Sequence, residues 1–406
     1  MAKPIRTAAI DIGATKVVCL IAETDSTKKT NVLGFGTAPA EGFRQGVVIS
    51  LDKATDAVAR AVASAEESAG GKVKAYPTFV GINGQHLKHI AGIGTVPVRK
   101  PDRGISQRDI HDVINQAQTI RLPNDEQILH VVPTQFIVDE QRGVRDPLGM
   151  FGVKLEVEVL LIIGGMSMIE NIYRVMDRLD IRNRHLLLQS LATSFAVCDE
   201  DDKNLGVALV DLGGVTDVSV YREGEIRYHK MLEVGSANIT KDVAIGLRTT
   251  FAQAEQVKRE YGVAMASMLD KDEPVTVEDA SGRGTKQVSR RLLASVIEPR
   301  VEEIVNLVDG EIRATGMADG LSVGVVLTGG GASLEGVDIL AEQVFGMPVR
   351  LGLPDRVTGP RDVTRDPSLS TAVGLVICGL DGRYTGWLPA GSWMSGIWDR
   401  FRGMFS

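Results

Sequence analysis

The stretch 205–221, LGVALVDLGGVTDVSVY, constrains the fold of this chain more than any other. Its apolar, β-branched run is typical of a buried strand, and this strand ends at Asp211. Gly213 and Gly214 then allow a tight turn, and the residues from Thr216 onward run back as a second strand. A glycine turn of this kind lets backbone N–H groups point into one small concavity that binds anions. The stretch therefore predicts a β-hairpin whose turn is an anion site.

A carboxylate stands at the mouth of the predicted anion site. Asp211 alone would repel a phosphate group, and a divalent cation or an ordered water between the two removes this conflict. The pairing of an acid with a glycine turn therefore indicates a Mg²⁺-nucleotide. A generic β-turn that happens to contain glycine is the alternative interpretation.

A second stretch of the same design lies near the start of the chain. The segment 7–16, TAAIDIGATK, again places an acid, Asp11, between an apolar strand and a glycine turn. Residues 17–23 continue as the returning strand. Two such hairpins, about 200 residues apart, indicate two related halves that hold one phosphate chain between them. The recurrence favours the nucleotide interpretation over an isolated β-turn.

The size and charge of the chain limit its class. With 406 residues it is too long for one ordinary core, so two or more domains are expected. The formal net charge of −7 gives the whole molecule no attraction for nucleic acid, so no nucleic-acid partner is expected. Cys19, Cys198 and Cys378 lie in apolar stretches without paired spacing, which is typical of buried thiols in a reducing compartment. No leader peptide or bilayer-spanning run is recognised, so export is not expected.

Between the two hairpins, an α/β rhythm is interrupted by a unit of different character. Strand, helix and strand patterns cover 31–38, 51–69 and 76–81, with Ser50 as a candidate helix cap. From about residue 86 onward, the chain has three strand-like segments, 87–93, 128–138 and 153–163, around one helix, 105–120. Ser106 and Asp109 form a candidate capping box at the start of that helix. The rhythm resumes with helix 167–180, strand 184–188 and helix 190–199.

Two features beyond the second hairpin have open alternatives. Glu255 and Lys258 lie three residues apart on one face of a predicted helix, 251–261, and spacing alone favours a solvent-exposed ion pair. The segment 328–333, TGGGAS, lies between a strand and a helix expected from about Leu334. That arrangement lets the backbone approach a ligand closely, and a plain loop is the alternative. Strand 225–234, helix 239–247, a polar loop or small β-excursion at 270–288 and a long helix, 289–313, complete this half.

The last fifteen residues predict an amphipathic helix. On a helical wheel its bulky apolar residues fall within an arc of about 140°. They are Trp393, Met394, Ile397, Trp398, Phe401, Met404 and Phe405. Tryptophans beside Arg400 and Arg402 favour a helix that lies in a membrane interface, and docking on the protein itself or on a partner is the alternative. The arginines favour anionic lipid, and one copy would bind weakly while an array of copies would bind well.

These residues resemble the FtsA family of bacterial cell-division proteins, within the actin and sugar-kinase ATPase superfamily. The stretch 146–156, DPLGMFGVKLE, and the amphipathic terminus carry the most specific part of the resemblance. It implies an α/β, actin-like, two-lobed ATPase fold of duplicated ribonuclease-H-like domains, with an inserted α+β subdomain and a C-terminal amphipathic helix. The implied parts are a first lobe (1–83, 164–200 and 366–382), an insertion (84–163), a second lobe (201–235 and 301–365) with a small subdomain (236–300), a linker (383–391) and the terminal helix (392–406).

The resemblance also implies a site for ATP and Mg²⁺ between the lobes. The first phosphate loop would be Asp11, Gly13, Ala14, Thr15 and Lys16, and the second Asp211, Gly213, Gly214, Val215 and Thr216, continuing to Asp217. Asp11 and Asp211 would hold Mg²⁺ through water. Glu255 and Lys258 would flank the adenosine, which replaces the exposed ion pair that spacing favours. Gly329, Gly330, Gly331 and Ala332 would pass under the base and the α-phosphate, and 367–379 would form the second connection between the lobes.

Three positions bear on the rate of ATP hydrolysis that the resemblance implies. Ala14 and Val215 replace residues that are more often Thr or Ser and Gly in this family, so the turns are tighter and slow hydrolysis or a structural use of ATP is expected. Gln189 falls at about the place from which related filament-forming ATPases orient the attacking water. It is the candidate catalytic residue.

The resemblance implies a protein that polymerises on the cytoplasmic face of the inner membrane at the division site. It would bind the C-terminal tail of the tubulin-like protein FtsZ through 236–300 and help to recruit later membrane proteins of the divisome. Two alternatives remain: an actin-like adaptor of pilus assembly, and a small-molecule kinase of the same superfamily, for which no motif for a carboxylate base beside a sugar hydroxyl is apparent.

Overall fold

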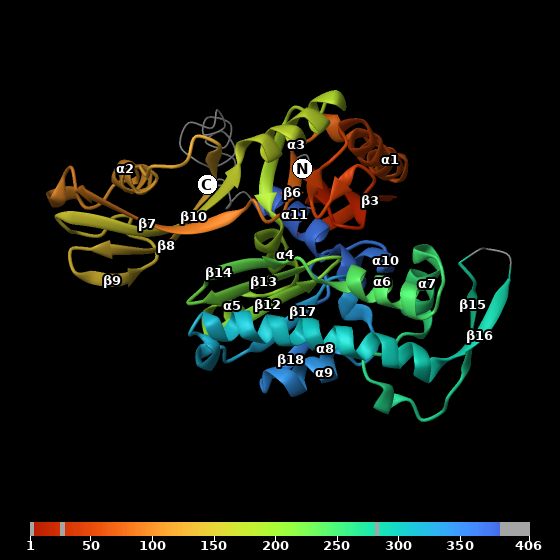
Figure 1. Ribbon diagram of the computed structural model, residues 1–406. Helices are drawn as coiled ribbons and strands as arrows, with labels where there is room; N and C mark the ends of the chain where they lie inside the picture. The colour runs from red at the N-terminus through yellow and green to blue at the C-terminus, as the bar shows by residue number, and fades with distance from the viewer. Residues whose placement is uncertain (1–3, 25–28, 281–283, 382–406) are drawn as a thin grey trace.

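The frame of the molecule is a pair of sheets with the same strand order. The computed structural model describes residues 4–24, 29–280 and 284–381 (Figure 1). The first sheet runs β11 (Arg184–Leu188), β6 (Thr78–Ile82), β1 (Arg6–Ile12), β2 (Lys16–Thr24) and β3 (Thr30–Pro39). The second runs β18 (Val349–Leu351), β17 (Gly324–Thr328), β12 (Val207–Leu212), β13 (Thr216–Arg222) and β14 (Glu225–Leu232).

In each sheet an antiparallel meander is extended by parallel strands. β1, β2 and β3 pair antiparallel, while β6 and β11 add parallel to β1. The meander of β12, β13 and β14 is extended in the same way by β17 and β18. The hairpins predicted from their apolar runs are therefore the corresponding central hairpins of two related halves. Both strands of each hairpin are almost fully buried, which is why their sequences lack a polar alternation.

Helices cover the first sheet. α1 (Leu51–Ala69) lies on β2 and β3, and α3 (Met166–Arg178) lies beside α1. The approach of α1 is close, since a Cβ on Gly36 would lie 2.2 Å from the carbonyl oxygen of Ala61. Gly70, at φ 62°, ends α1 at the predicted boundary after residue 69, whereas Ser50 makes no side-chain cap hydrogen bond. Short elements complete this lobe: β4 (Phe43–Arg44), β5 (Val47–Val48) and the 3₁₀ turn Val73–Ala75.

The second lobe has a core part and an outlying part. α8 (Arg290–Ala314) packs on β13, and α9 (Val337–Phe345) packs on α8 and β18. The outlying part contains α6 (Ser236–Gly246), α7 (Phe251–Tyr261) and the hairpin of β15 (Pro274–Glu278) and β16 (Thr285–Ser289), which accounts for the polar segment 270–288 (Figure 1). The helix expected from about Leu334 begins later, at Val337, because a 3₁₀ turn, Gly330–Ser333, follows β17.

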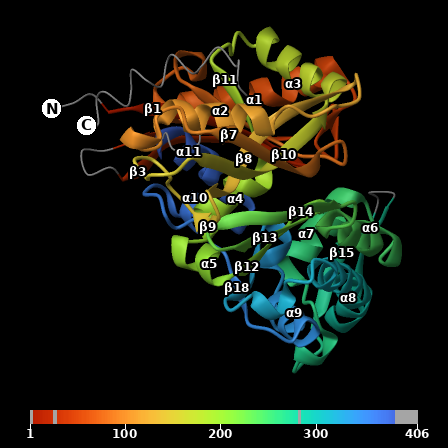
Figure 2. The same ribbon diagram turned by 90° about the vertical axis from the view of Figure 1, so that its left-hand side faces the viewer.

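The insertion is a compact α+β unit with its own apolar core. Its sheet runs β7 (Lys88–Pro97), β10 (Lys154–Gly165), β8 (Glu126–Val138) and β9 (Gln141–Val144), and α2 (Gln107–Ala117) packs on β7 and β10. The capping box is present, because Ser106 and Asp109 each bond the other's backbone N–H. No local pattern in the sequence predicts β9, which is short and mostly polar. The insertion extends to the left of the first lobe in Figure 1, and in both views the lobes lie one above the other (Figures 1 and 2).

Two helices join the lobes. α4 (Gln189–Val197) follows β11 and contacts both sheets, and α11 (Ser370–Asp381) packs on α4 and on β1, β2 and β6. α5 (Glu200–Leu205) then leads into β12, so the strand predicted to start at Leu205 begins at Val207. α10 (Arg361–Thr364) precedes α11. One hydrophobic cluster contains residues of the first sheet, of both joining helices and of β12 and β13, so the lobes share buried contacts.

The predicted terminal helix, 392–406, and its linker, 383–391, lie outside the described residues. Within the described part of the chain, no helix is both long enough and apolar enough to cross a membrane.

Candidate functional site

The two glycine turns meet face to face between the lobes. A Cβ built on Gly214 would lie 2.9 Å from the Cβ of Ala14 and 3.0 Å from Cγ2 of Thr15. The first turn is closed by its own backbone, since the N–H of Gly13 donates to the carbonyl of Lys16 at 3.0 Å. The second turn is held by α6, since the carbonyl of Gly213 accepts from the N–H of Ser236 at 2.8 Å. The structure thus brings together two segments that are about 200 residues apart in the sequence.

Three carboxylates gather behind these turns. Asp11 lies at the end of β1, and Asp211 and Asp217 are cross-strand partners in the hairpin of β12 and β13. Burial raises the pKa of Asp11 to about 7, with a further contribution from the charge of Asp211. Burial also raises the pKa of Asp211 to about 6, and burial and Asp211 together hold the pKa of Asp217 well above its usual value. A buried group of acids of this kind is stabilised by a cation.

Gln189, the first residue of α4, reaches the first turn. Its Nε2 donates to Oδ1 of Asp11 at 2.7 Å and to the carbonyl of Ile12 at 2.9 Å. Gln189 therefore lies at the site, as the resemblance implies, and its amide holds Asp11 in place.

Lys16 supplies a positive charge beside these acids. It is half-buried, and its Nζ donates to Oγ of Ser368 at 2.6 Å. Burial lowers the pKa of Lys16, and the nearby charges of Asp366 and Asp11 oppose this effect. Ser368 and Asp366 belong to the segment that precedes α11, so the second joining helix takes part in the site.

The triple glycine packs against the second hairpin. A Cβ on Gly329 would lie 2.2 Å from Oδ1 of Asp211, and one on Gly331 would lie 2.6 Å from Cγ of Leu212. These two glycines are thus required by the contact between β12 and the end of β17. Gly330 is exposed, and a Cβ there would meet only Cβ of Ser368 at 3.4 Å, while Ala332 is buried.

Glu255 and Lys258 form an ion pair that is not the solvent-exposed one that spacing favoured. The Nζ of Lys258 lies 2.7 Å from Oε2 of Glu255 and donates to the hydroxyls of Ser236 and Thr240, each at 2.8 Å. Lys258 is 6% exposed, because its amine ties α7 to α6. α7 also borders a hollow of about 460 Å³ that is lined by Ala252, Glu255, Gln256, Arg259 and Glu260.

The residues present fit a triphosphate with a hydrated cation. The hydroxyl of Thr216 and Oδ1 of Asp217 are buried and have no hydrogen-bond partner among the described residues. A phosphate oxygen would accept from the hydroxyl of Thr216, and a bound water would donate to Oδ1 of Asp217. Among the described residues, no cluster of three or more His, Cys, Asp and Glu has metal-site geometry.

Several residues of this site were missed by the sequence analysis. Asn83 follows β6 and bonds Asp217 across the lobes, and Thr371 of α11 donates to Oδ2 of Asp211 at 3.3 Å. Arg259 follows the predicted Lys258 and lowers the pKa of Lys16 by its charge, which places it toward the phosphate turns. Of these residues, Asn83 has a local signal in the sequence, since Asn-Gly is typical of a turn.

Two repeated lobes, facing glycine turns and an acid at each turn define an actin-like protein. Solved structures agree on the fold. A PilM–PilN type IV pilus biogenesis complex matches with a TM-score of 0.63 at 13% identity, over 92% of this chain and 98% of that one. MreB 5 of Spiroplasma citri bound to AMPPNP matches with a TM-score of 0.57 at 11% identity, over 100% of both chains.

Sequence relatives identify the particular family. Cell division protein FtsA of Pseudomonas aeruginosa is 38% identical over 93% of this chain and 90% of its own length. FtsA of Escherichia coli K12 is 34% identical over 93% and 91%, and FtsA of Bacillus subtilis 35% over 90% and 82%. The family model for cell division protein FtsA matches residues 208–374, and that for the SHS2 domain inserted in FtsA matches 84–163. The chain belongs to the FtsA family of cell division proteins.

Proposed function

We propose that this chain is an ATP-binding adaptor of the division apparatus that tethers FtsZ to the inner membrane. The observation that carries the proposal is the pair of glycine turns that face each other across the lobes, with buried acids and Lys16 beside them. A chain of phosphates bound beside both turns would contact both lobes at once and fix their relative orientation.

Each part of the site has a place in this proposal. The N–H groups of 13–16 and 213–216, together with Lys16 and the hydroxyl of Thr216, would bind the phosphates. Asp11 and Asp211 would hold Mg²⁺ through water, and Mg²⁺ would neutralise charge on the phosphates. Glu255 and Lys258 would flank the adenosine beside the hollow on α7, and 329–332 would pass under the base.

ATP would act mainly as a switch. Lobes held in one orientation present fixed surfaces for self-association into filaments, whereas separated lobes do not. The outlying part of the second lobe, 236–300, would take the C-terminal tail of FtsZ, and the filament would help to recruit later membrane proteins of the divisome. These roles are those that the family resemblance implies.

The terminal segment would provide the membrane attachment on the cytoplasmic face. Seven bulky apolar residues with Arg400 and Arg402 give weak binding per copy to anionic lipid, and a filament multiplies it. Anchoring would therefore depend on polymerisation.

Deleting 392–406 tests the tether. The truncated protein should no longer co-sediment with phosphatidylglycerol vesicles, while its affinity for ATP stays unchanged, because the deleted segment contains none of the residues assigned to the nucleotide site. A matched control replaces Trp393 and Trp398 by alanine in the full chain, which should reduce vesicle binding at least tenfold. Undiminished binding of the truncated protein would refute the tether, and FtsZ-tail peptide recruited to vesicles only with the full chain would support the adaptor.

A further inference from the structure

The insertion is part of the first lobe by sequence, but it also touches the second lobe. It leaves the first sheet after β6 and returns to it through α3, and its inner residues Leu87, Leu129 and Leu160 share a hydrophobic cluster with that sheet. Ile226 of β14 belongs to the same cluster. β14 is an edge strand of the second sheet, and β8 of the insertion contacts it. The insertion therefore bridges the lobes in addition to the two joining helices.

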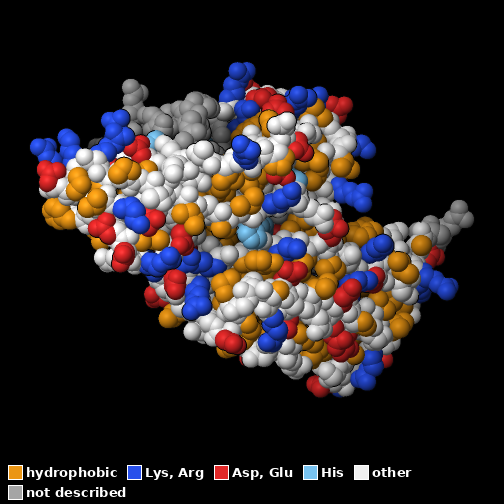
Figure 3. Space-filling model, turned by 60° about the vertical axis from the view of Figure 1, so that its left-hand side comes forward, with side chains coloured by type: hydrophobic (Ala, Val, Ile, Leu, Met, Phe, Trp, Pro, Cys, Tyr) orange, Lys and Arg blue, Asp and Glu red, His pale blue; other side chains and the backbone are white. Residues whose placement is uncertain are grey.

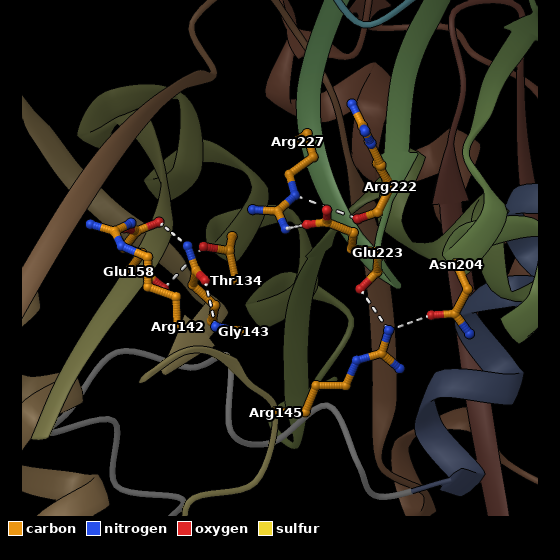
Figure 4. A network of polar contacts seen from close by, with 10 residues as sticks. Thr134, Arg142, Gly143, Arg145, Glu158, Asn204, Arg222, Glu223 and Arg227 are labelled. Atoms are coloured by element: carbon orange, nitrogen blue, oxygen red, sulfur yellow. Dashed lines mark hydrogen bonds and ion pairs between the residues drawn. The ribbon is translucent and has the colours of Figure 1, made fainter. Parts of the chain in front are cut away.

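The outer contact of this bridge is made by Arg145. Its Nη2 donates to Oδ1 of Asn204 at 2.6 Å and to the carbonyl of Glu223 at 3.1 Å (Figure 4). The two acceptors are already held together, because the N–H of Glu223 donates to the carbonyl of Asn204 at 3.3 Å. A Cβ on Gly224 would lie 3.5 Å from Nη2 of Arg145, so the turn lies directly against the guanidinium. Arg145 thus meets a preformed pair of acceptors on the second lobe.

The inner contact is made by His89 of β7. Its ring lies edge-on to the ring of Tyr228 on β14, with the two centroids 5.5 Å apart. Tyr228 is held in turn, because its hydroxyl donates to Oε2 of Glu311 on α8 at 2.5 Å. The two contacts therefore follow β14, one at the turn before the strand and one near its middle.

A third contact reaches the joint between the lobes. Nε2 of His130, on β8, accepts a hydrogen bond from the N–H of Leu188 at 3.1 Å, and Leu188 directly precedes α4. The insertion is thus bonded to the joint and to the second lobe at the same time. A rotation of the second lobe about α4, away from the insertion, would break the contacts of Arg145 and His89 and leave that of His130 in place.

We propose that the insertion is a clasp that holds the lobes closed, and that Arg145 is the contact that opens and recloses. The inference rests on the proposed binding of ATP between the lobes, since a nucleotide held from both sides leaves only when they separate. Arg145 and Glu223 are exposed, and an exposed contact of this kind changes an equilibrium at most about fivefold. The clasp therefore tunes the opening of the lobes without locking them. By linkage, any partner of the insertion that displaces Arg145 would loosen the lobes.

The rate at which nucleotide leaves the full chain tests the clasp. A fluorescent ADP analogue bound with Mg²⁺ should dissociate about fivefold faster from Arg145→Met, which keeps the apolar stem and removes the donors. Arg145→Lys should stay within about twofold of the wild type, because both bonds come from one nitrogen and an ammonium carries three hydrogens. Arg142→Met is the matched control, since Arg142 pairs with Glu158 inside the insertion, and its rate should not change. An unchanged rate in Arg145→Met, or an equal increase in Arg142→Met, would overturn the clasp.

A distance measurement supplies a readout without nucleotide. Cys19, Cys198 and Cys378 are all buried, so cysteines introduced at exposed positions can be spin-labelled selectively. Labels at Arg108→Cys on α2 and Glu342→Cys on α9 report the separation of the insertion from the second lobe. In the nucleotide-free protein, Arg145→Met should broaden the distribution of distances, and Arg142→Met should not.

An identical distribution in the wild type and in Arg145→Met would overturn the clasp. A wild-type protein that does not bind the ADP analogue would instead refute the proposed function, and the label distances would then decide the clasp alone.

Discussion

Gly329 shows how a single residue shapes the site. It has φ 84°, and a Cβ there would lie 2.2 Å from Oδ1 of Asp211. The residue thus meets two separate demands, a left-handed backbone and close contact with the acid of the second turn. From the sequence alone, all three glycines are equally able to let a ligand approach the backbone. In the structure, Gly329 and Gly331 are buried in packing contacts, and Gly330 is exposed.

Replacing Gly329 by alanine should destabilise the protein by about 2–4 kcal/mol, since backbone strain and overpacking add. Gly346→Ala is the matched control, because Gly346 has φ 64° with nothing within 4 Å of the added Cβ. The Gly346→Ala substitution should lower the free energy of unfolding only by the backbone strain, about 1 kcal/mol. Denaturant unfolding measures both, and equal losses would show that the contact with Asp211 is not tight.

His130 gives the fold a defined pH dependence. It lies on β8 and is 1% exposed, and its Nε2 accepts a hydrogen bond from the N–H of Leu188 at 3.1 Å. Burial lowers the pKa of His130 from 6.5 to about 4. Between these values the unfolded chain binds a proton that the folded one does not, so stability falls as the pH falls through this window.

The contribution of His130 should amount to roughly 2–3 kcal/mol between pH 7 and pH 4.5. His130→Gln keeps an acceptor without the titration, so the variant should lose less stability than the wild type over that range. Urea unfolding at the two pH values measures the difference. An identical loss in both proteins would contradict the assignment.

At the scale of elements, the insertion contacts both lobes. Beyond the end of β9, Arg145 reaches the second lobe, where Nη2 donates to Oδ1 of Asn204 at 2.6 Å and to the carbonyl of Glu223 at 3.1 Å (Figure 4). Arg142, on β9 itself, pairs with Glu158 of its own sheet. On the face that carries the insertion, basic and acidic side chains lie next to one another (Figure 3).

Arg145→Ala should loosen the insertion without unfolding the protein. Because Arg145 is exposed, the global loss should stay below about 1 kcal/mol. Amide exchange at 141–144 and 223–224 should become faster. Arg142→Ala removes a comparable contact within the insertion, so it should leave exchange at 223–224 unchanged. Faster exchange there in both variants would refute a specific tie through Arg145.

At the scale of the whole molecule, the interlobe site should couple ligand binding to stability. Mg²⁺-ATP at 100 times its dissociation constant should stabilise the folded chain by about 2.7 kcal/mol. Lys16→Ala should remove most of this gain, because its amine lies beside the phosphate turns. Lys53→Ala, on an exposed face of α1, should retain it. Thermal unfolding with and without Mg²⁺-ATP measures the difference, and full stabilisation of Lys16→Ala would exclude that lysine from the site.

The sequence by itself determined the two hairpins, the α/β rhythm and the insertion. These depend on local signals, namely apolar runs, glycine turns and helix periodicity, that act over a few residues. β9 and α5 were missed because they are short and polar, so packing rather than pattern decides them.

Only the tertiary structure decided which side chains meet. The contact of Gly214 with Ala14, the bond from Asn83 to Asp217 and the burial of Lys258 join segments whose spacing in the chain carries no information about distance. A buried partner changes what a residue does, so Lys258, predicted from spacing as half of an exposed pair, instead ties two helices together. Local periodicity determines where the helices and strands form. The site depends on contacts between the two lobes, because the energies of burial and pairing exist only once the lobes are packed.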